Sequence, residues 1–183
     1  MRFIGLVMLL AGLWVTPAMA AEQASDTKTA QTKSADEAEK SPEQQAMDKL
    51  AAAGIGEAIK AIKKFGSFYP FGLVQKGDSA QAMTYTGEKE DAPAPEQWVE
   101  VLYRKLQEEG KKKPDVDMLA LFRLHEISDD EGNQVIGVWA LVDHRDVRPW
   151  VIFLPFLEKD NGKYEPGEPV YYPTDQSLFD HSE

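Results

Sequence analysis

The sequence predicts an α+β domain in which an antiparallel sheet of about five strands carries two helices packed on one face. Two segments have apolar residues at helical spacing, and each precedes a group of short segments rich in β-branched and aromatic residues. Turn signals of a few residues separate most of the latter, and strands joined by such short turns must be antiparallel. The predicted order is α-β-β-α-β-β-β, over residues 42–175.

The first helix is expected to begin at SPEQQ. Ser41 can cap it, Pro42 suits the first helical position, and Gln44 completes a capping box. Apolar residues follow at helical spacing as far as Ile62. Gly66 is the expected stop, because glycine readily adopts the left-handed conformation that ends many helices.

A hairpin and a second helix come next. FYPFGLVQK, residues 68–76, predicts a strand, and the turn KGDS leads into a second strand at residues 80–87. The polar loop EKEDAPAP then precedes a helix from about Glu96 to Glu109, which Gly110 ends. The apolar stripe of this helix consists of Trp98, Leu102, Tyr103 and Leu106.

Three strands are predicted at residues 116–127, 133–143 and 149–157, with a shorter one at 168–173. The three longer segments are apolar on both faces. In an antiparallel sheet with one solvent-exposed face, apolar and polar residues would alternate along each strand. If two helices cover one face, the other needs a cover of its own. The alternatives are a ligand, a second subunit, which would make a homodimer, or the C-terminal segment with Tyr171, Tyr172, Leu178 and Phe179.

The stretch DHRDVRPWVIFLPF, residues 143–156, contains the His-Arg-Asp triplet of a protein-kinase catalytic loop. The glycine-rich loop and the other kinase motifs that must accompany it are missing from the sequence. We therefore expect residues 143–148 to be a solvated turn between two strands. Replacing Arg145 or Asp146 by alanine would then change stability by only about 0.5 kcal/mol.

No catalytic residue, metal site or cofactor is predicted. The histidines His125, His144 and His181 lack the spacing of a helical metal pair, and no G-x-S-x-G motif supports Ser-His-Asp catalysis. His181 falls in residues 176–183, which we expect to fray.

The first 20 residues predict a cleaved signal peptide. Arg2 is their only charge, an apolar run of about 13 residues follows, and Ala18-Met19-Ala20 is a small-x-small cleavage site. The alternative is an uncleaved anchor, but a membrane-spanning helix needs roughly 20 apolar residues. The polar residues 21–40 are expected to be a disordered tether, since they have little apolar surface to bury. The protein is therefore expected in the periplasm, with release into the medium as the alternative.

The composition limits the partners. Twenty basic and 31 acidic residues give a net charge of −11, which disfavours binding to nucleic acid. Cysteine is absent, so disulfides and a lipid-modified cysteine are ruled out. We expect no stable membrane anchor and a protein partner or a homodimer.

Three short motifs carry a resemblance. FYPFG at residues 68–72, VDHRD at 142–146 and VIFLPF at 151–156 resemble a loose group of small uncharacterised bacterial α+β proteins. In that group a Pro-Phe strand opens the first hairpin and a charged hairpin precedes a strand ending in Pro-aromatic. The resemblance implies a compact domain with the order given above, no assigned activity and no catalytic residues.

The preferred interpretation is an exported binding or interaction module without catalysis, such as an inhibitor or immunity-type protein, for which acidity would suit a basic partner. The alternative is a small ligand-binding protein or enzyme with a pocket near His125 and His144. The candidate binding residues are Phe68, Tyr69, Phe71, His144, Arg145 and Trp150.

Overall fold

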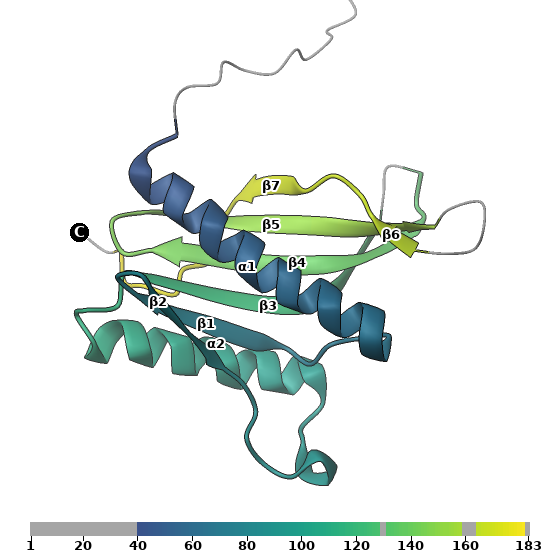
Figure 1. Ribbon diagram of the computed structural model, residues 1–183, viewed down its shortest axis with the longest axis horizontal. Coiled ribbons are helices and arrows are strands. Elements are labelled where there is room, and N and C mark those ends of the chain that lie inside the picture. Colours follow the sequence, from purple (N-terminus) through teal and green to yellow (C-terminus); the bar gives the residue numbers. More distant parts are fainter. Residues whose placement is uncertain (1–39, 129–130, 159–163, 182–183) are drawn as a thin grey trace, which may run out of the picture. The chain divides into compact units, whose positions relative to one another are not determined.

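The computed structural model describes residues 40–128, 131–158 and 164–181. The predicted signal peptide and nearly all of the predicted tether lie outside these residues. The elements are α1 (Pro42–Phe65), β1 (Phe71–Lys76), β2 (Ser79–Met83), a 3-10 turn (Lys89–Asp91), α2 (Pro95–Lys112), β3 (Met118–Ser128), β4 (Gln134–His144), β5 (Val147–Glu158), β6 (Tyr164–Pro166) and β7 (Val170–Pro173) (Figure 1).

The strands form one antiparallel sheet in the order β2-β1-β3-β4-β5-β6, and β7 also pairs with β5. The protein is therefore α+β. Among the described residues the sheet has seven strands rather than about five, because the chain pairs with β5 twice more, as β6 and then as β7. The predicted order α-β-β-α-β-β-β is incomplete for the same reason.

The helix α1 begins and ends where its local sequence predicts. The Ser41 hydroxyl accepts a hydrogen bond from the Gln44 amide, and the Gln44 side chain accepts one from the Ser41 amide, so the capping box is complete. Gly66 ends the helix with a φ of 79°, in the left-handed region that glycine adopts without steric cost.

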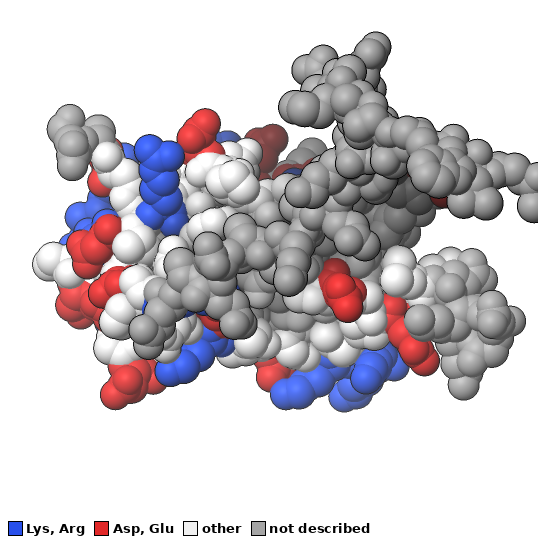
Figure 2. Space-filling view, turned by 90° about the horizontal axis from the view of Figure 1, so that it is seen from above, with Lys and Arg blue, Asp and Glu red and all other residues white. Residues whose placement is uncertain are grey.

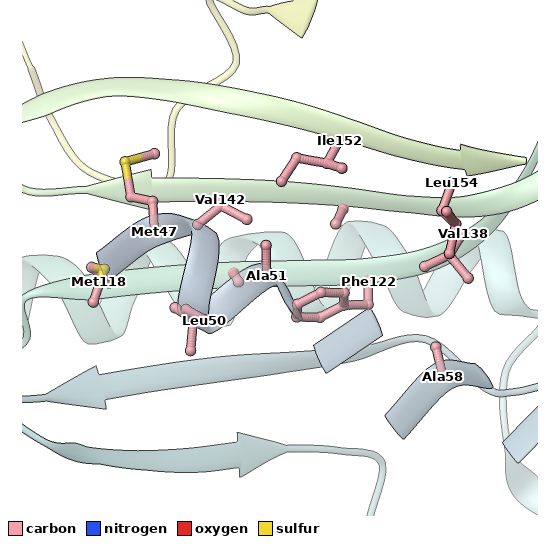
Figure 3. Close-up of a cluster of buried hydrophobic side chains, with 12 residues drawn as sticks. Met47, Leu50, Ala51, Ala58, Met118, Phe122, Val138, Val142, Ile152 and Leu154 are labelled. Carbon is pink, nitrogen blue, oxygen red and sulfur yellow. The ribbon is translucent and has the colours of Figure 1, made fainter. Parts of the chain in front are cut away.

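The two helices lie on opposite faces of the sheet, so the prediction that both pack on one face is wrong. One buried cluster joins α1 to β3, β4 and β5, with the ring of Phe122 lying against the helix (Figure 3). Gly54 allows this approach, because a Cβ atom there would lie 2.1 Å from the Phe122 ring. Alternate residues of each strand face opposite sides, and both sides are covered within one chain.

The second cluster joins α2 to the other face of the sheet, and the C-terminal tail, residues 174–181, completes it. Leu102 and Leu106 of α2 are fully buried there, as is Leu178 of the tail. Phe179 is also buried, whereas Tyr171 and Tyr172 of β7 remain partly exposed. The apolar character of both strand faces is thus accounted for by α1, α2 and the tail. A homodimer stays a prediction, but no bare sheet face in the described residues supports it.

Asp143 anchors the tail, and this overturns two expectations. Its carboxylate is fully buried and accepts hydrogen bonds from the amides of Leu178 (2.6 Å) and Phe179 (2.9 Å) and from the Ser177 hydroxyl (2.9 Å). Its other oxygen lies 2.9 Å from Nε2 of His181. Asp143 is therefore not a solvated turn residue, and the tail as far as His181 is packed rather than frayed. Residues 182 and 183 lie outside the described residues.

Arg145 also makes tertiary contacts and is not a solvated turn residue. The turn itself is as predicted, with Arg145 and Asp146 between β4 and β5. However, the Arg145 guanidinium group donates to the carbonyls of Val116, Gly110 and Lys113 at 3.0–3.1 Å. It thereby holds the end of α2 and the start of β3. Only Asp146 and Arg148 of the predicted solvated turn are exposed.

Among the described residues, no helix combines the length and apolar character needed to cross a lipid bilayer. On the face seen in Figure 2, acidic and basic side chains are interspersed rather than gathered by sign.

Candidate functional site

The candidate site lies where β1 ends and β3 continues. In the pairing of these strands Phe71 stands opposite Phe122, and the ladder stops there. The strand β3 runs on to Ser128. Within the described part of the chain, residues 123–128 therefore have a strand partner on one side only, namely β4.

Pro70 explains why the ladder stops. By register it would stand opposite Arg123, but proline has no N–H group to donate. Its carbonyl accepts a hydrogen bond from Nε1 of Trp98 instead, at 2.9 Å. Neither backbone group of Pro70 is thus available to β3, and the edge of β3 stays open beyond Phe122.

A cleft of about 600 Å³ lies along this open edge. Consecutive residues of β3, Arg123 to Glu126, all line it. Successive side chains of a strand point to opposite faces, so a cleft touched by four in a row must follow the edge of the strand. The remaining lining includes Phe68, Tyr69, Glu96 and Ile136.

An aromatic cluster makes one wall of the cleft rigid. The rings of Tyr69 and Trp98 stack with their centroids 6.3 Å apart, and the Tyr85 ring meets Trp98 edge-on at 5.5 Å. The Tyr69 hydroxyl donates to the carbonyl of Pro93 at 2.7 Å. Loop and helix are thereby tied together, so the wall is in place before anything binds.

Arg123 is the prominent charged group of the site. Its guanidinium lies 4.6 Å from the centroid of the Trp139 ring, the residue opposite it on β4. Its Nε atom is buried without a hydrogen-bond partner. Burial lowers the pKa of this half-buried group, and the charge of Glu96 counteracts part of that effect. In the described residues Arg123 forms no ion pair within 4.0 Å, so its hydrogen-bonding capacity is available.

Two smaller hollows adjoin the cleft at Arg123. One, of about 420 Å³, runs between α2 and the sheet and is lined by Tyr103. The other, of about 350 Å³, reaches β7 and is lined by Tyr172. Both also touch Trp139 and Gln176, so the tail forms their common wall. Arg123 thus stands where three depressions meet.

His125 lies two residues from Arg123 and therefore on the same face of β3. Burial lowers the pKa of its imidazole, the nearby positive charge of Arg123 lowers it further, and Glu126 raises it. The imidazole is therefore neutral at neutral pH and is poised to gain a proton when a negative charge approaches.

The structure brings together only some of the predicted site residues. Phe68 and Tyr69 line the cleft, as does His125. Phe71 instead stacks on Phe122 beneath α1, with centroids 4.9 Å apart. Trp150 packs against the α1 cluster and lines a different hollow beside the start of that helix.

His144 and Arg145 belong to the opposite end of the sheet. His144 is 9 % exposed, and its Nδ1 accepts a hydrogen bond from the Asp146 amide. It pairs with Met118 of β3, seven residues from His125 along the strand, which is roughly 23 Å at about 3.3 Å per residue. A pocket shared by His125 and His144 is thus ruled out by the register.

Ser177, Asp143 and His181 have the composition of a catalytic triad but not its order. Asp143 lies in the middle, bonded to both the serine and the histidine. In a working triad the histidine stands between the other two, since it must take the proton of the nucleophile. The group therefore holds the tail and is not arranged to activate Ser177.

The residues that sequence reasoning missed are Arg123, Trp139 and Glu96. The signal for Arg123 was present, because a lone positive charge interrupts the apolar run of LALFRLHEI. Its pairing with Trp139 depends on the register of β3 and β4, which the sequence alone does not determine.

Within the described residues, no group of three or more histidine, cysteine, aspartate or glutamate side chains could hold a metal ion. Comparisons with models of protein families, with curated proteins and with solved structures found no match to this chain. The resemblance noted from the three short motifs stays a prediction.

Proposed function

We propose that the protein is an exported interaction module that binds a segment of a partner protein in the cleft between residues 68–70 and the open edge of β3. The observation that carries the proposal is the half-buried guanidinium of Arg123, which has no hydrogen-bond partner at Nε and lies in the cleft lining. A buried polar group without a partner is costly, so it calls for a specific explanation. A complementary group on a partner supplies one.

The rest of the cleft supports a protein partner. It is lined by aromatic and aliphatic side chains together with charges of both signs, a mixture typical of protein-binding surfaces. The second apolar face of the sheet, for which a ligand or a second subunit was one possible cover, is covered by α2 and the tail. Two of the binding residues predicted from the sequence, Phe68 and Tyr69, line the cleft.

Export is the second component of the proposal, and residues 1–20 support it by their signal-peptide pattern. An inhibitor or immunity-type role is one form that the interaction would take, because a chain of net charge −11 suits a basic partner. Intact-mass measurement of the exported protein should give a chain that begins at Ala21. A mass that retains the first 20 residues would remove export from the proposal.

Site-specific photocrosslinking tests the cleft. The photoreactive amino acid p-benzoylphenylalanine is placed at Ser67, an exposed residue of the cleft lining, in cells that export the protein. The matched control position is Lys112, which is also exposed and lies at the far end of α2. We expect a discrete adduct from Ser67 that is absent from Lys112 and is abolished when Arg123→Glu is added.

Equal adducts from both positions, or an adduct that survives Arg123→Glu, would contradict the proposed site. Far-ultraviolet circular dichroism of each variant shows whether it is folded, so that loss of the adduct is not mistaken for loss of structure.

A further inference from the structure

We infer that the partner segment binds as an extended strand added to the open edge of β3, with one of its carboxylates against Arg123. The inference rests on the proposed function, because it specifies how the cleft recognises its partner. It concerns the backbone of residues 123–128 and one side chain.

The edge offers backbone groups for pairing. In an antiparallel strand, the N–H and C=O groups of alternate residues point to one neighbour and those of the residues between them to the other. Residues 118–122 use their outer groups to pair with β1. Beyond Phe122, the same outer groups face the cleft, where an extended peptide in line with β1 would meet them.

Three of the usual protections of a sheet edge are missing here, although Arg123 and Glu126 are charged. Sheet edges are commonly blocked by proline, by lysine or by shortness of the strand. The sequence from Arg123 to Ser128 is RLHEIS, with no proline and no lysine. The outer strands differ, since β2 has five residues and β7 has four and ends at Pro173. Residues 123–128 are therefore a suitable template for one further strand, which would pair with them in addition to the six strand pairings of the described residues.

Arg123 selects the charge of the incoming strand. Its guanidinium lies 4.6 Å from the centroid of the Trp139 ring, and a guanidinium can donate two parallel hydrogen bonds to one carboxylate. Glu96 and Glu126 also line the cleft and favour a basic residue in a neighbouring position of the segment. The cleft thus fits a β-forming segment that carries an acidic residue flanked by basic ones.

Two synthetic peptides test the inference on the mature chain, residues 21–183. The first alternates threonine and valine, residues that favour strands, with a central glutamate and a lysine at each end. The second has glutamine in place of glutamate. Affinity is measured by calorimetry, and the location of binding by amide hydrogen exchange.

We expect the glutamate peptide to bind about tenfold more tightly than the glutamine peptide, since a hydrogen bond to a charged group is stronger than one to a neutral group. Bound peptide should slow the exchange of amides within residues 123–128. In Arg123→Gln the two peptides should bind equally, whereas Arg148→Gln, which alters an exposed arginine away from the cleft, should keep the difference.

Absence of saturable binding below about 1 mM, or protection at β2 or β7 instead of β3, would overturn strand addition. Equal affinity of both peptides for the unaltered protein would overturn the role of Arg123. If the Ser67 adduct persists in either case, the cleft remains the binding site and only the manner of recognition is wrong. If that adduct is also absent, the proposed function fails as well.

Discussion

The guanidinium of Arg145 lies 4.6 Å from the centroid of the Phe179 ring, so a turn residue of β4 and β5 covers a buried residue of the tail. Arg123 lies at the same distance from the ring of Trp139. The two arginines differ in their hydrogen bonds. Arg145 donates to three backbone carbonyls, whereas Nε of Arg123 has no partner. This difference underlies the predictions for Arg145 and Arg123.

Replacing Arg145 by alanine should lower the free energy of unfolding by about 2–4 kcal/mol, because two half-buried hydrogen bonds, to the carbonyls of Val116 and Gly110, and an exposed one, to that of Lys113, are lost. This reverses the sequence-based expectation of about 0.5 kcal/mol. Urea denaturation measures the change, with Arg148→Ala as the exposed control. Equal, small losses in both variants would show that the carbonyls of Val116, Gly110 and Lys113 do not depend on Arg145.

Replacing Asp143 by asparagine should lower the free energy of unfolding by about 2–3 kcal/mol, because the neutral amide oxygen accepts hydrogen bonds from the tail amides more weakly than the charged carboxylate does. The amides of Leu178 and Phe179 should also exchange faster with solvent. The control is Asp146→Asn at an exposed position of the same turn. An unchanged exchange rate at Leu178 would mean that Asp143 does not hold the tail.

Replacing Arg123 by methionine should leave the free energy of unfolding unchanged or raise it by up to about 1 kcal/mol. Methionine keeps the apolar stem against Trp139 and removes a half-buried charge that has no ion-pair partner in the described residues. Thermal and urea denaturation measure the change. A loss similar to that of Arg145→Ala would assign Arg123 a structural role instead.

Two glycines of α1 form a matched pair. Alanine at Gly54 should destabilise the protein by about 1–3 kcal/mol, because its Cβ would meet the Phe122 ring at 2.1 Å. Alanine at Gly56 should stabilise it by roughly 0.5–1 kcal/mol, because no atom lies within 4 Å and alanine favours the helix. Denaturation of both variants tests the packing of α1 on β3, and shifts of the same sign would contradict it.

The stability contribution of His125 should depend on pH. Its pKa in the folded protein is lowered from the ordinary value of 6.5, first by burial and then by Arg123. As the pH falls through about 6.5, the unfolded chain takes up the proton before the folded one, so the free energy of unfolding decreases until the folded pKa is passed. Urea denaturation of the protein and of His125→Gln from pH 7.5 to 5 should show a smaller acid-induced loss in the variant. Parallel curves would show that the pKa of His125 is not lowered.

Local signals predicted both ends of α1 correctly, whereas α2 continues to Lys112, past its expected end at Gly110. The capping box of Ser41 and Gln44 and the glycine stop at Gly66 are interactions between near neighbours, so the sequence contains them directly. The placement of α1 and α2 on opposite faces was missed, because two-sided apolar strands indicate that both faces are covered without saying which element covers each. The C-terminal segment with Leu178 and Phe179 was one of the predicted covers for the second face of the sheet, and these two residues do pack on it.

The site was less predictable for a physical reason. Phe68 and Tyr69 could be suspected from an aromatic segment, but the cleft exists because Pro70 ends a ladder with a strand about 50 residues away along the chain. Asp143 and Arg145 were misjudged because their partners, the tail and the end of α2, are equally remote in sequence. Charged residues in a short turn are usually solvated, and only tertiary contacts mark these two as exceptions.

The anchoring of Leu178 and Phe179 also sets the order in which the two cores close as the chain is made. The buried members of the α1 cluster end at Leu154, so that side of the sheet is complete in sequence before β6 and β7 emerge. The α2 cluster lacks its last members until Phe179 has left the ribosome. The face that α2 covers therefore receives its last buried residues, Leu178 and Phe179, after the opposite face has all of its own.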